Sequence, residues 1–350
     1  MLTLALAGKP NSGKSTFFKA STLAEVDIAN YPFTTIDANH GVAYVRTKCP
    51  CTTLGLRCGF CQDGVRFVPI GLVDVAGLVP EAYKGRGLGN QFLDHLREAE
   101  AIIHVVDGSG STDAEGNPLS PGSHDPCKDI DFLPFEMTMW IYGILNKHWA
   151  KLQRMAQAKN FSMEKAIAEI FGGLGITIEH VHHAEQGISD LSRASEEEIV
   201  AFCRRLLFES KPMLVVANKV DQAPEHMVEA LSEHKVLFSS AASELALRKA
   251  AETGLIRYTP GDLSFSVVKE ESLSAPQKAG LTRVASVMER WNGTGVQAAL
   301  DAAVFKLLDM IVVYPVEDEQ HYSDRQGRVL PDAFLMKRGS TPKDLAYRVH

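Results

Sequence analysis

Short apolar runs alternate with amphipathic stretches in the first third of the chain and again after residue 208. The apolar runs have the length of β-strands, whereas stretches such as residues 15–23 and 90–100 have helical composition. Strands that alternate with helices predict an α/β fold with a mostly parallel sheet and helices on both faces. The predicted strands are residues 2–7, 41–46, 67–73, 101–106, 211–218 and 235–239.

The alternation stops between residues 107 and 208. Residues 107–129 are rich in Gly, Ser, Pro and Asp, which is typical of a long loop. From Met137 to Met155, apolar residues recur at three- and four-residue steps, which predicts an amphipathic helix. Further helices are expected at residues 163–171 and 196–208, with breaks at residues 172–173 and 180–187.

These changes of pattern predict the domain organisation. We interpret residues 117–208 as a helical domain inserted into an α/β domain that comprises residues 1–116 and 209–310. From residue 311 the chain reads as strand, turn, strand and helix, so residues 311–350 are expected to form a third domain. Because so few residues cannot close a sheet of ordinary size, we expect this domain to be incomplete. The helices expected before it are residues 243–252 and 281–310.

Composition narrows the class of protein. The 350 residues are 45% hydrophobic and 23% charged, as is usual for a globular protein, and the net charge is -7. This acidic balance disfavours a general nucleic-acid binder. No apolar run reaches the roughly 20 residues of a membrane-spanning helix, and no cleavable leader precedes the first strand. We therefore expect a cytoplasmic protein without a membrane partner.

The first strand leads into a phosphate-binding motif. Residues 8–15 (GKPNSGKS) match G-x-x-x-x-G-K-[ST], a loop whose backbone N–H groups surround nucleotide phosphates. The Lys14 ammonium is expected to reach the β- and γ-phosphates, and the Ser15 hydroxyl is expected to bind Mg²⁺. The predicted phosphate-binding residues are Asn11, Ser12, Gly13, Lys14, Ser15 and Thr16.

Two further motifs follow predicted strands. Asp74 and Gly77 form D-x-x-G, in which the carboxylate can hold Mg²⁺ and the glycine N–H can contact the γ-phosphate. Asn218, Lys219 and Asp221 form N-K-x-D. A carboxylate at Asp221 accepts from both N1–H and the N2 amino group of guanine, a donor pair that adenine lacks. After the next strand, backbone N–H groups of Ser240, Ala241 and Ala242 are expected near guanine O6.

The loop of residues 30–37 (NYPFTTID) contains Thr34 and Thr35. A threonine hydroxyl from this loop would complete the Mg²⁺ shell when the γ-phosphate is present, and hydrolysis would release it. Either threonine can serve on spacing alone.

Together, GKPNSGKST, NYPFTTIDANHG, DVAGLVPEAYKGRGLGNQFLDHLR and NKVD resemble the Obg group of translation-associated GTPases. The helical insertion and the C-terminal STPKDLAYRVH narrow the resemblance to its YchF-type (Obg-like ATPase) branch, in an archaeal-looking form. The resemblance implies a P-loop GTPase domain with a helical insertion and a C-terminal TGS domain of β-grasp type. It favours Thr35, with Ser15, as Mg²⁺ ligand, and it implies GTP and GDP as ligands. It also implies the ribosome or its subunits as partner, with RNA contacts through the TGS-like and helical domains.

Two features bear on activity. Some members of this branch prefer ATP because their N-K-x-D segment is altered, but that segment is intact here, which favours GTP. Leu78 stands where related enzymes carry a glutamine that orients water, so we expect slow hydrolysis of GTP to GDP and phosphate. Asn11 stands where relatives of this kind recruit K⁺, which makes K⁺ dependence a hypothesis, and His124 is a weaker candidate near the γ-phosphate. The predicted catalytic residues are Lys14, Thr35, Gly77 and Asn11.

Two readings of the activity stay open. The chain is either a GTP-hydrolysing switch or a nucleotide-regulated scaffold with negligible hydrolysis.

Four of the six cysteines form a compact cluster, C-x-C-x6-C-x2-C, made of Cys49, Cys51, Cys58 and Cys61. Four thiolates so close in sequence can reach the tetrahedral geometry of Zn²⁺, and an iron–sulfur cluster is a weaker alternative. Four free thiols in a hairpin remain the other interpretation.

Overall fold

The computed structural model describes residues 1–22, 39–84, 97–158 and 160–349. The chain divides into two compact units. The first consists of Met1–Leu2, Lys19–Leu72 and Ala242–His350, and the second of Thr3–Phe18 and Val73–Ala241. Thr34, Thr35 and residues 90–96 of the helix expected at residues 90–100 lie outside the described residues.

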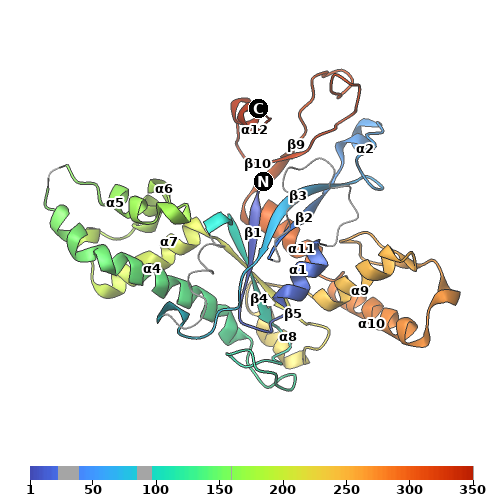
Figure 1. Cartoon of the computed structure of the whole chain (residues 1–350), viewed down its shortest axis with the longest axis horizontal. Helices are drawn as coiled ribbons and strands as arrows, with labels where there is room; N and C mark the ends of the chain where they lie inside the picture. The colour runs from blue at the N-terminus through green and yellow to red at the C-terminus, as the bar shows by residue number, and fades with distance from the viewer. Residues whose placement is uncertain (23–38, 85–96, 159, 350) are drawn as a thin grey trace. The chain divides into compact units, whose positions relative to one another are not determined.

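Parallel strands form the centre of the second unit (Figure 1). Adjacent strands follow the order β1 (Thr3–Ala7), β4 (Ala101–Asp107), β5 (Met213–Asn218) and β6 (Val236–Phe238). Every residue of β4 is buried, as expected for a parallel strand covered on both faces. The register pairs Asp107 with Asn218, so the polar residues that end β4 and β5 lie side by side. The predicted parallel sheet is therefore confirmed. The helices that accompany these strands are α1 (Lys14–Thr22) and α8 (Glu225–Ser232).

In the described part of the chain between β4 and β5, four helices pack against one another, drawn green to yellow-green in Figure 1. They are α4 (Cys127–Met155), α5 (Met163–Ile170), α6 (Ile178–Ala184) and α7 (Glu196–Ser210). The apolar stripe predicted on α4 is buried at Met137, Ile141, Leu145, Trp149 and Leu152. It is therefore core, as its period indicates. Single 3-10 turns also occur at Ala82–Lys84, Gly172–Leu174 and Leu191–Arg193.

The predicted break at residues 180–187 is wrong, because α6 occupies most of it. The Thr177 side chain accepts from the His180 backbone N–H, and the His180 side chain accepts from the Thr177 N–H. This capping box compensates for the low helix propensity of the histidines. It also replaces the usual glutamate at the third position with a histidine, which is why the sequence pattern did not reveal it.

In the first unit, β2 (His40–Lys48) lies beside β3 (Val65–Asp74), whose last two residues belong to the second unit, and α2 (Pro50–Leu54) lies between the two strands in sequence. The single helix predicted for residues 281–310 is wrong. Instead, α10 (Ala275–Trp291) begins at a Ser274 capping box and ends where Asn292 adopts a left-handed conformation, with φ of 56°. The elements that complete this region are α9 (Ala241–Glu252), β7 (Ile256–Arg257), β8 (Ser266–Val267), the 3-10 turn Glu270–Ser272, α11 (Val296–Asp301) and the π-helical Ala302–Leu307.

The C-terminal part has the predicted order of strand, turn, strand and helix. The antiparallel pair β9 (Met310–Val313) and β10 (Phe334–Lys337) precedes α12 (Pro342–Val349). A complete β-grasp sheet has more strands than this pair, so the assignment to a TGS domain stays a prediction.

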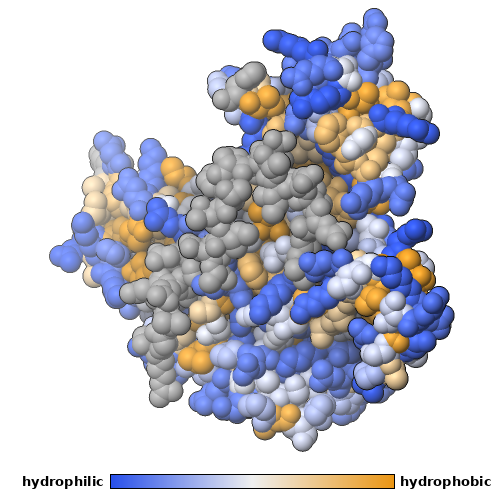
Figure 2. All heavy atoms as spheres, turned by 45° about the vertical axis from the view of Figure 1, so that its right-hand side comes forward, coloured by the Kyte–Doolittle hydropathy of each residue, from blue (hydrophilic) through white to orange (hydrophobic). Residues whose placement is uncertain are grey.

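Apolar residues on the face drawn in Figure 2 lie in separate patches between hydrophilic ones. Among the described helices, none combines the length and the apolar composition that are needed to cross a membrane.

Candidate nucleotide-binding site

The phosphate-binding loop joins β1 to α1, as predicted. Ser12 and Lys14 are buried, and the Lys14 ammonium donates to the Lys9 carbonyl oxygen at 2.9 Å. Burial lowers the pKa of Lys14, and the nearby Asp74 carboxylate partly opposes this effect. The Ser12 hydroxyl is buried and has no hydrogen-bond partner within the described parts of the chain. An anion in the loop would satisfy both groups.

Ser15 and Asp74 come together as the Mg²⁺ prediction requires. The Ser15 hydroxyl donates to Oδ2 of Asp74 at 2.8 Å. Oδ1 of Asp74 is buried and lacks a hydrogen-bond partner among the described residues. A hydroxyl and a carboxylate with a spare oxygen suit Mg²⁺, which prefers oxygen ligands. The donor set therefore fits the ion.

Asn218 connects the end of β5 to the phosphate-binding loop. Its amide Nδ2 donates to the Ser12 carbonyl at 3.2 Å, and its Oδ1 accepts from the Ala241 N–H at 3.0 Å. A Cβ atom on Gly13 would lie 2.3 Å from Nδ2 of Asn218, and Gly13 has φ of 95°. Only glycine permits this approach, so residue 13 serves the contact with β5 as well as the loop.

Asp221 lies where a base-reading carboxylate is predicted, and it is exposed. Its Oδ1 accepts from the Ser240 hydroxyl at 2.7 Å, and its Oδ2 accepts from Gln222 Nε2 at 3.3 Å. Ser240 thus orients the carboxylate. The backbone N–H of Ala241, which was expected near guanine O6, donates to Asn218. Ala242, the third residue expected there, lies in the next helix and belongs to the first unit.

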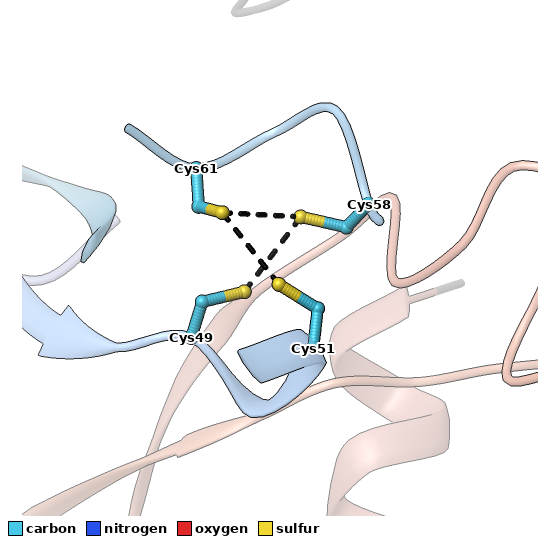
Figure 3. A group of neighbouring side chains, drawn as sticks. All are labelled: Cys49, Cys51, Cys58 and Cys61. Carbon is cyan, nitrogen blue, oxygen red and sulfur yellow. Dashed lines mark hydrogen bonds between the residues drawn. The ribbon is translucent and has the colours of Figure 1, made fainter. Parts of the chain in front are cut away.

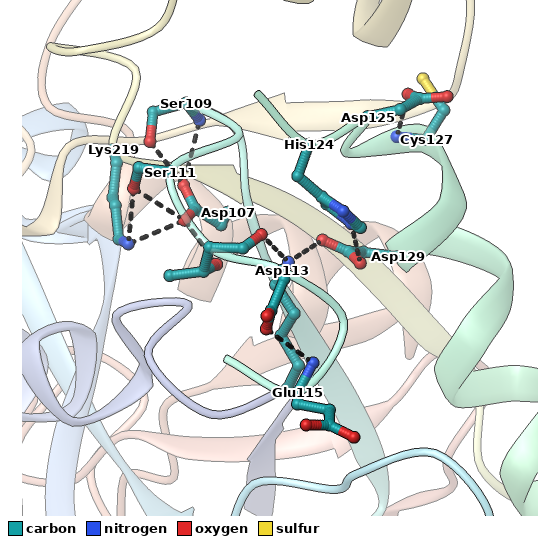
Figure 4. A network of polar contacts seen from close by, with 12 residues as sticks. Asp107, Ser109, Ser111, Asp113, Glu115, His124, Asp125, Cys127, Asp129 and Lys219 are labelled. Carbon is teal, nitrogen blue, oxygen red and sulfur yellow. Dashed lines mark hydrogen bonds and ion pairs between the residues drawn. The ribbon is translucent and has the colours of Figure 1, made fainter. Parts of the chain in front are cut away.

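Asp107 is a site residue that the sequence analysis missed (Figure 4). This fully buried carboxylate accepts from the hydroxyls of Ser109, Ser111 and Thr112 and from the Lys219 ammonium at 2.9 Å. Burial by itself raises the pKa of Asp107, but these hydrogen bonds outweigh burial and lower it. The residues DGSGST after a buried strand carry the signal, because serine and threonine hydroxyls often bond a nearby aspartate in a turn. Asp107 therefore positions Lys219.

The loop after β4 also contacts the start of the phosphate-binding loop. The Lys9 ammonium is buried, pairs with Asp129 at 2.6 Å and donates to the Thr112 carbonyl at 2.8 Å. Nε2 of His124 lies 2.9 Å from the other oxygen of Asp129. The His124 ring is thus bonded to α4, which leaves its proposed contact with a phosphate without support.

The groups considered for catalysis are held close to the loop. A Cβ on Gly77 would lie 2.8 Å from the Pro10 nitrogen, and the Leu78 N–H donates to the Gly8 carbonyl at 3.2 Å. The Leu78 side chain is buried in the apolar core. Asn11, with φ of 58°, donates its amide to the Gly116 carbonyl at 2.9 Å. Thr16 lies in the first turn of α1.

The four clustered cysteines lie together in the first unit, and none of them forms a disulfide. Lys14, Ser15, Asp74, Asn218 and Asp221, by contrast, belong to the second unit.

Comparison with known proteins agrees with these motifs. Residues 3–127 match the family model described as 50S ribosome-binding GTPase. Residues 216–318 match the Obg-like GTPase YGR210-like, G4 motif-containing domain.

An uncharacterized GTP-binding protein of Methanocaldococcus jannaschii is 44% identical over 360 residues, which cover 100% of this chain and 90% of that protein. The ribosome-binding ATPase YchF of Mycoplasma genitalium is 34% identical over 218 residues, but the match covers only 62% of this chain and 56% of that protein. A crystal structure of a GTP binding protein from Pyrococcus horikoshii OT3 has a TM-score of 0.76 at 37% identity and covers 100% of this chain and 90% of that one. This chain belongs to the YchF/Obg-like family of P-loop GTP-binding proteins.

Proposed function

We propose that the chain binds GTP with Mg²⁺, hydrolyses it slowly to GDP and phosphate, and acts as a switch that the ribosome reads. The observation that carries the proposal is the convergence of Lys14, Ser15, Asp74, Asn218 and Asp221 within one compact unit. The residues expected to bind the phosphates and those expected to bind the base therefore belong to the same compact unit.

The phosphates would replace contacts that the loop makes within itself. Lys14 would exchange the Lys9 carbonyl for phosphate oxygens, and the Ser12 hydroxyl would gain a partner. Mg²⁺, when bound, would neutralise charge on the β- and γ-phosphates. Ser15 and Asp74 would hold it, with Thr35 as the predicted third protein ligand. Gly77 would offer its backbone N–H to the γ-phosphate.

Guanine selectivity would reside in Asp221. Its two oxygens match the N1–H and N2 amino donors of guanine, and the Ser240 hydroxyl restricts its rotation. Lys219, held by Asp107, would pack its alkyl stem along the base.

The assignment of Asp221 as the guanine-binding residue is tested by a variant that should prefer another base. In Asp221→Asn, the side chain presents one acceptor and one donor, which suits xanthine (a 2-oxo group in place of the amine) better than guanine. We expect affinity for GTP to fall at least 100-fold and affinity for XTP to rise. The exposed Asp131→Asn is the matched control. An Asp221→Asn protein that keeps its affinity for GTP would refute the assignment, and tight ATP binding by the wild type would refute guanine selectivity.

Slow turnover follows from Leu78. A buried leucine cannot orient the attacking water, so single-turnover hydrolysis without a partner is expected on the order of 10⁻³ s⁻¹ or slower. The scaffold reading differs in one respect, because it predicts that no partner accelerates this step. Single-turnover rates with and without ribosomes separate the two readings, and acceleration supports the switch.

The ribosome is proposed because relatives are named for it, as the YchF protein described above is. Co-sedimentation with ribosomes in GTP, GDP and nucleotide-free buffers measures whether binding depends on nucleotide. Such a partner would place the protein in the cytoplasm.

The K⁺ hypothesis concerns Asn11, whose amide is bonded to Gly116. If K⁺ contributes through Asn11, hydrolysis will be faster in K⁺ than in Na⁺, and Asn11→Ala will remove the difference. Equal rates in the two salts would reject the hypothesis.

A further inference from the structure

The sulfur atoms of Cys49, Cys51, Cys58 and Cys61 form a closed group (Figure 3). Three of the Sγ–Sγ distances are 3.7 Å for Cys49–Cys58, 3.6 Å for Cys51–Cys61 and 3.5 Å for Cys58–Cys61. All four atoms lie within 4.8 Å of one another. The group is therefore compact in three dimensions as well as in sequence.

The Sγ–Sγ distances distinguish a disulfide, a single metal ion and an iron–sulfur cluster from one another. Disulfide sulfurs lie about 2.05 Å apart, and none of these cysteines is paired. Sulfur ligands about 2.3 Å from a tetrahedral Zn²⁺ lie about 3.8 Å from one another, by the geometry of a tetrahedron. A cluster of several iron ions would hold its thiolates farther apart. A single tetrahedral metal ion fits best.

The backbone holds the thiols in place. Cys49 precedes α2, its N–H donates to the Gly64 carbonyl at 2.8 Å, and Pro50 begins the helix. The Phe60 N–H donates to Sγ of Cys58 at 3.4 Å, a contact that favours a thiolate. Two turns thus present one pair of cysteines each toward a common centre.

A buried arginine near the cysteines is a second observation that supports a metal site. Arg66 is buried, and its Nη1 has no hydrogen-bond partner in the described segments, where no carboxylate pairs with it either. Its guanidinium lies 5.1 Å from the ring centre of Phe60, between Cys58 and Cys61 in sequence. A buried cation is costly without a counter-charge. Four thiolates around Zn²⁺ carry two net negative charges, which would supply it.

The same cluster contacts the distant segment 314–331. Leu330 is buried against Cys49, Cys51 and Cys58, and Tyr314 also packs on them. Nη2 of Arg66 donates to the Pro331 carbonyl at 2.6 Å.

We propose that Cys49, Cys51, Cys58 and Cys61 bind one structural Zn²⁺, that Arg66 partly neutralises the net negative charge of this tetrathiolate site, and that the ion holds segment 314–331 against residues 49–64. The proposal does not depend on nucleotide chemistry.

Metal content of the full chain, purified without added zinc, is the first test. We expect one equivalent of zinc per chain, and replacement by Co²⁺ should give the charge-transfer bands of a tetrahedral tetrathiolate site. Cys58→Ser should lose the zinc, whereas Cys127→Ser, outside the cluster, should keep it. Protein without bound metal, or with one equivalent of iron instead, would overturn the assignment.

Whether the zinc ion holds segment 314–331 in place is tested by hydrogen exchange. Removal of zinc by a chelator should speed hydrogen exchange in residues 49–64 and 314–331 and leave GTP affinity unchanged. This measurement uses wild-type protein, so it stands even if Cys58→Ser fails to fold. Exchange that stays the same in residues 314–331 would overturn the coupling.

The charge balance is tested by Arg66→Met, which keeps an apolar stem without the guanidinium. Zinc affinity should fall roughly tenfold, as for loss of an outer partner of a metal site. Arg57→Met, an exposed change in the same loop, is the control. Equal zinc affinity in the two variants would overturn the role of Arg66.

Discussion

At the scale of single residues, the site depends on close approaches that leave no room for an added atom. Gly13 is the clearest case, because its missing side chain allows Asn218 to bond the phosphate-binding loop. The chain therefore joins two motifs that lie about two hundred residues apart through one hydrogen bond.

Gly13→Ala should push Asn218 away from the loop and lower GTP affinity at least tenfold, since the new Cβ would lie 2.3 Å from the amide. Gly143→Ala is the control, because a Cβ there meets no atom within 4 Å and lies in a helix. That variant should be more stable by up to about 1 kcal/mol. Titration with fluorescent GTP measures the affinity, and unchanged binding by Gly13→Ala would contradict this account.

His104 is a buried group that should make stability depend on pH. Burial lowers its pKa to about 3, with a further contribution from Lys14. At pH values between about 3 and 6.5, the unfolded chain binds a proton at His104 that the folded chain does not bind, so acid favours unfolding. The contribution of His104 to stability is thus complete above pH 6.5 and falls as the pH is lowered.

Removing the imidazole should remove this dependence. Relative to His104→Phe, the wild type should lose about 1.4 kcal/mol of unfolding free energy per pH unit below pH 6. Urea unfolding at several pH values gives the difference, and the exposed His148→Gln should behave as the wild type does. A constant difference between wild type and His104→Phe across this range would show that His104 titrates normally.

At the scale of elements, local side-chain caps decide where several helices begin. The Ser195 hydroxyl accepts from the Glu198 N–H, and the Glu198 carboxylate accepts from the Ser195 N–H at 2.8 Å. This reciprocal pair sets the start of α7, which packs against α4 and α6.

Ser195→Ala should destabilise the start of α7 by about 1 kcal/mol, because one helix N–H loses its acceptor. Hydrogen exchange in the first turn of α7 should then be about fivefold faster. Ser232→Ala, in which the serine bonds only the preceding turn of α8, should leave exchange in α7 unchanged. Unchanged exchange in Ser195→Ala would show that packing alone positions the helix.

At the scale of the whole molecule, the nucleotide site and the cysteine cluster belong to different compact units. Their ligands should therefore stabilise different parts of the chain. Mg²⁺ and GTP at 100 times the dissociation constant should add about 2.7 kcal/mol to the unit that binds them. Hydrogen exchange resolved by peptide should show this protection in the phosphate-binding loop and β5, and not in residues 49–64. Equal protection of both regions would indicate that the units are coupled.

The sequence by itself determined which segments form the parallel strands, where the phosphate-binding motif lies between the first strand and the first helix, and the family. These features follow from local patterns, because strand length, helical period and motif spacing are properties of short segments. The sequence patterns did not predict three features of the helices, because caps and core packing override propensity there. These features are the start of α4 at Cys127, the interruption after Trp291 and the helix at residues 178–184.

Only the tertiary structure decided which side chains meet. It brings Asp107 to Lys219, Lys9 to Asp129, and Arg66 to Pro331. Each of these contacts joins segments far apart in the sequence, and a buried charge has to find its counter-charge wherever folding places one. No local pattern carries that information, because the burial that makes the pairing necessary exists only once the chain has folded.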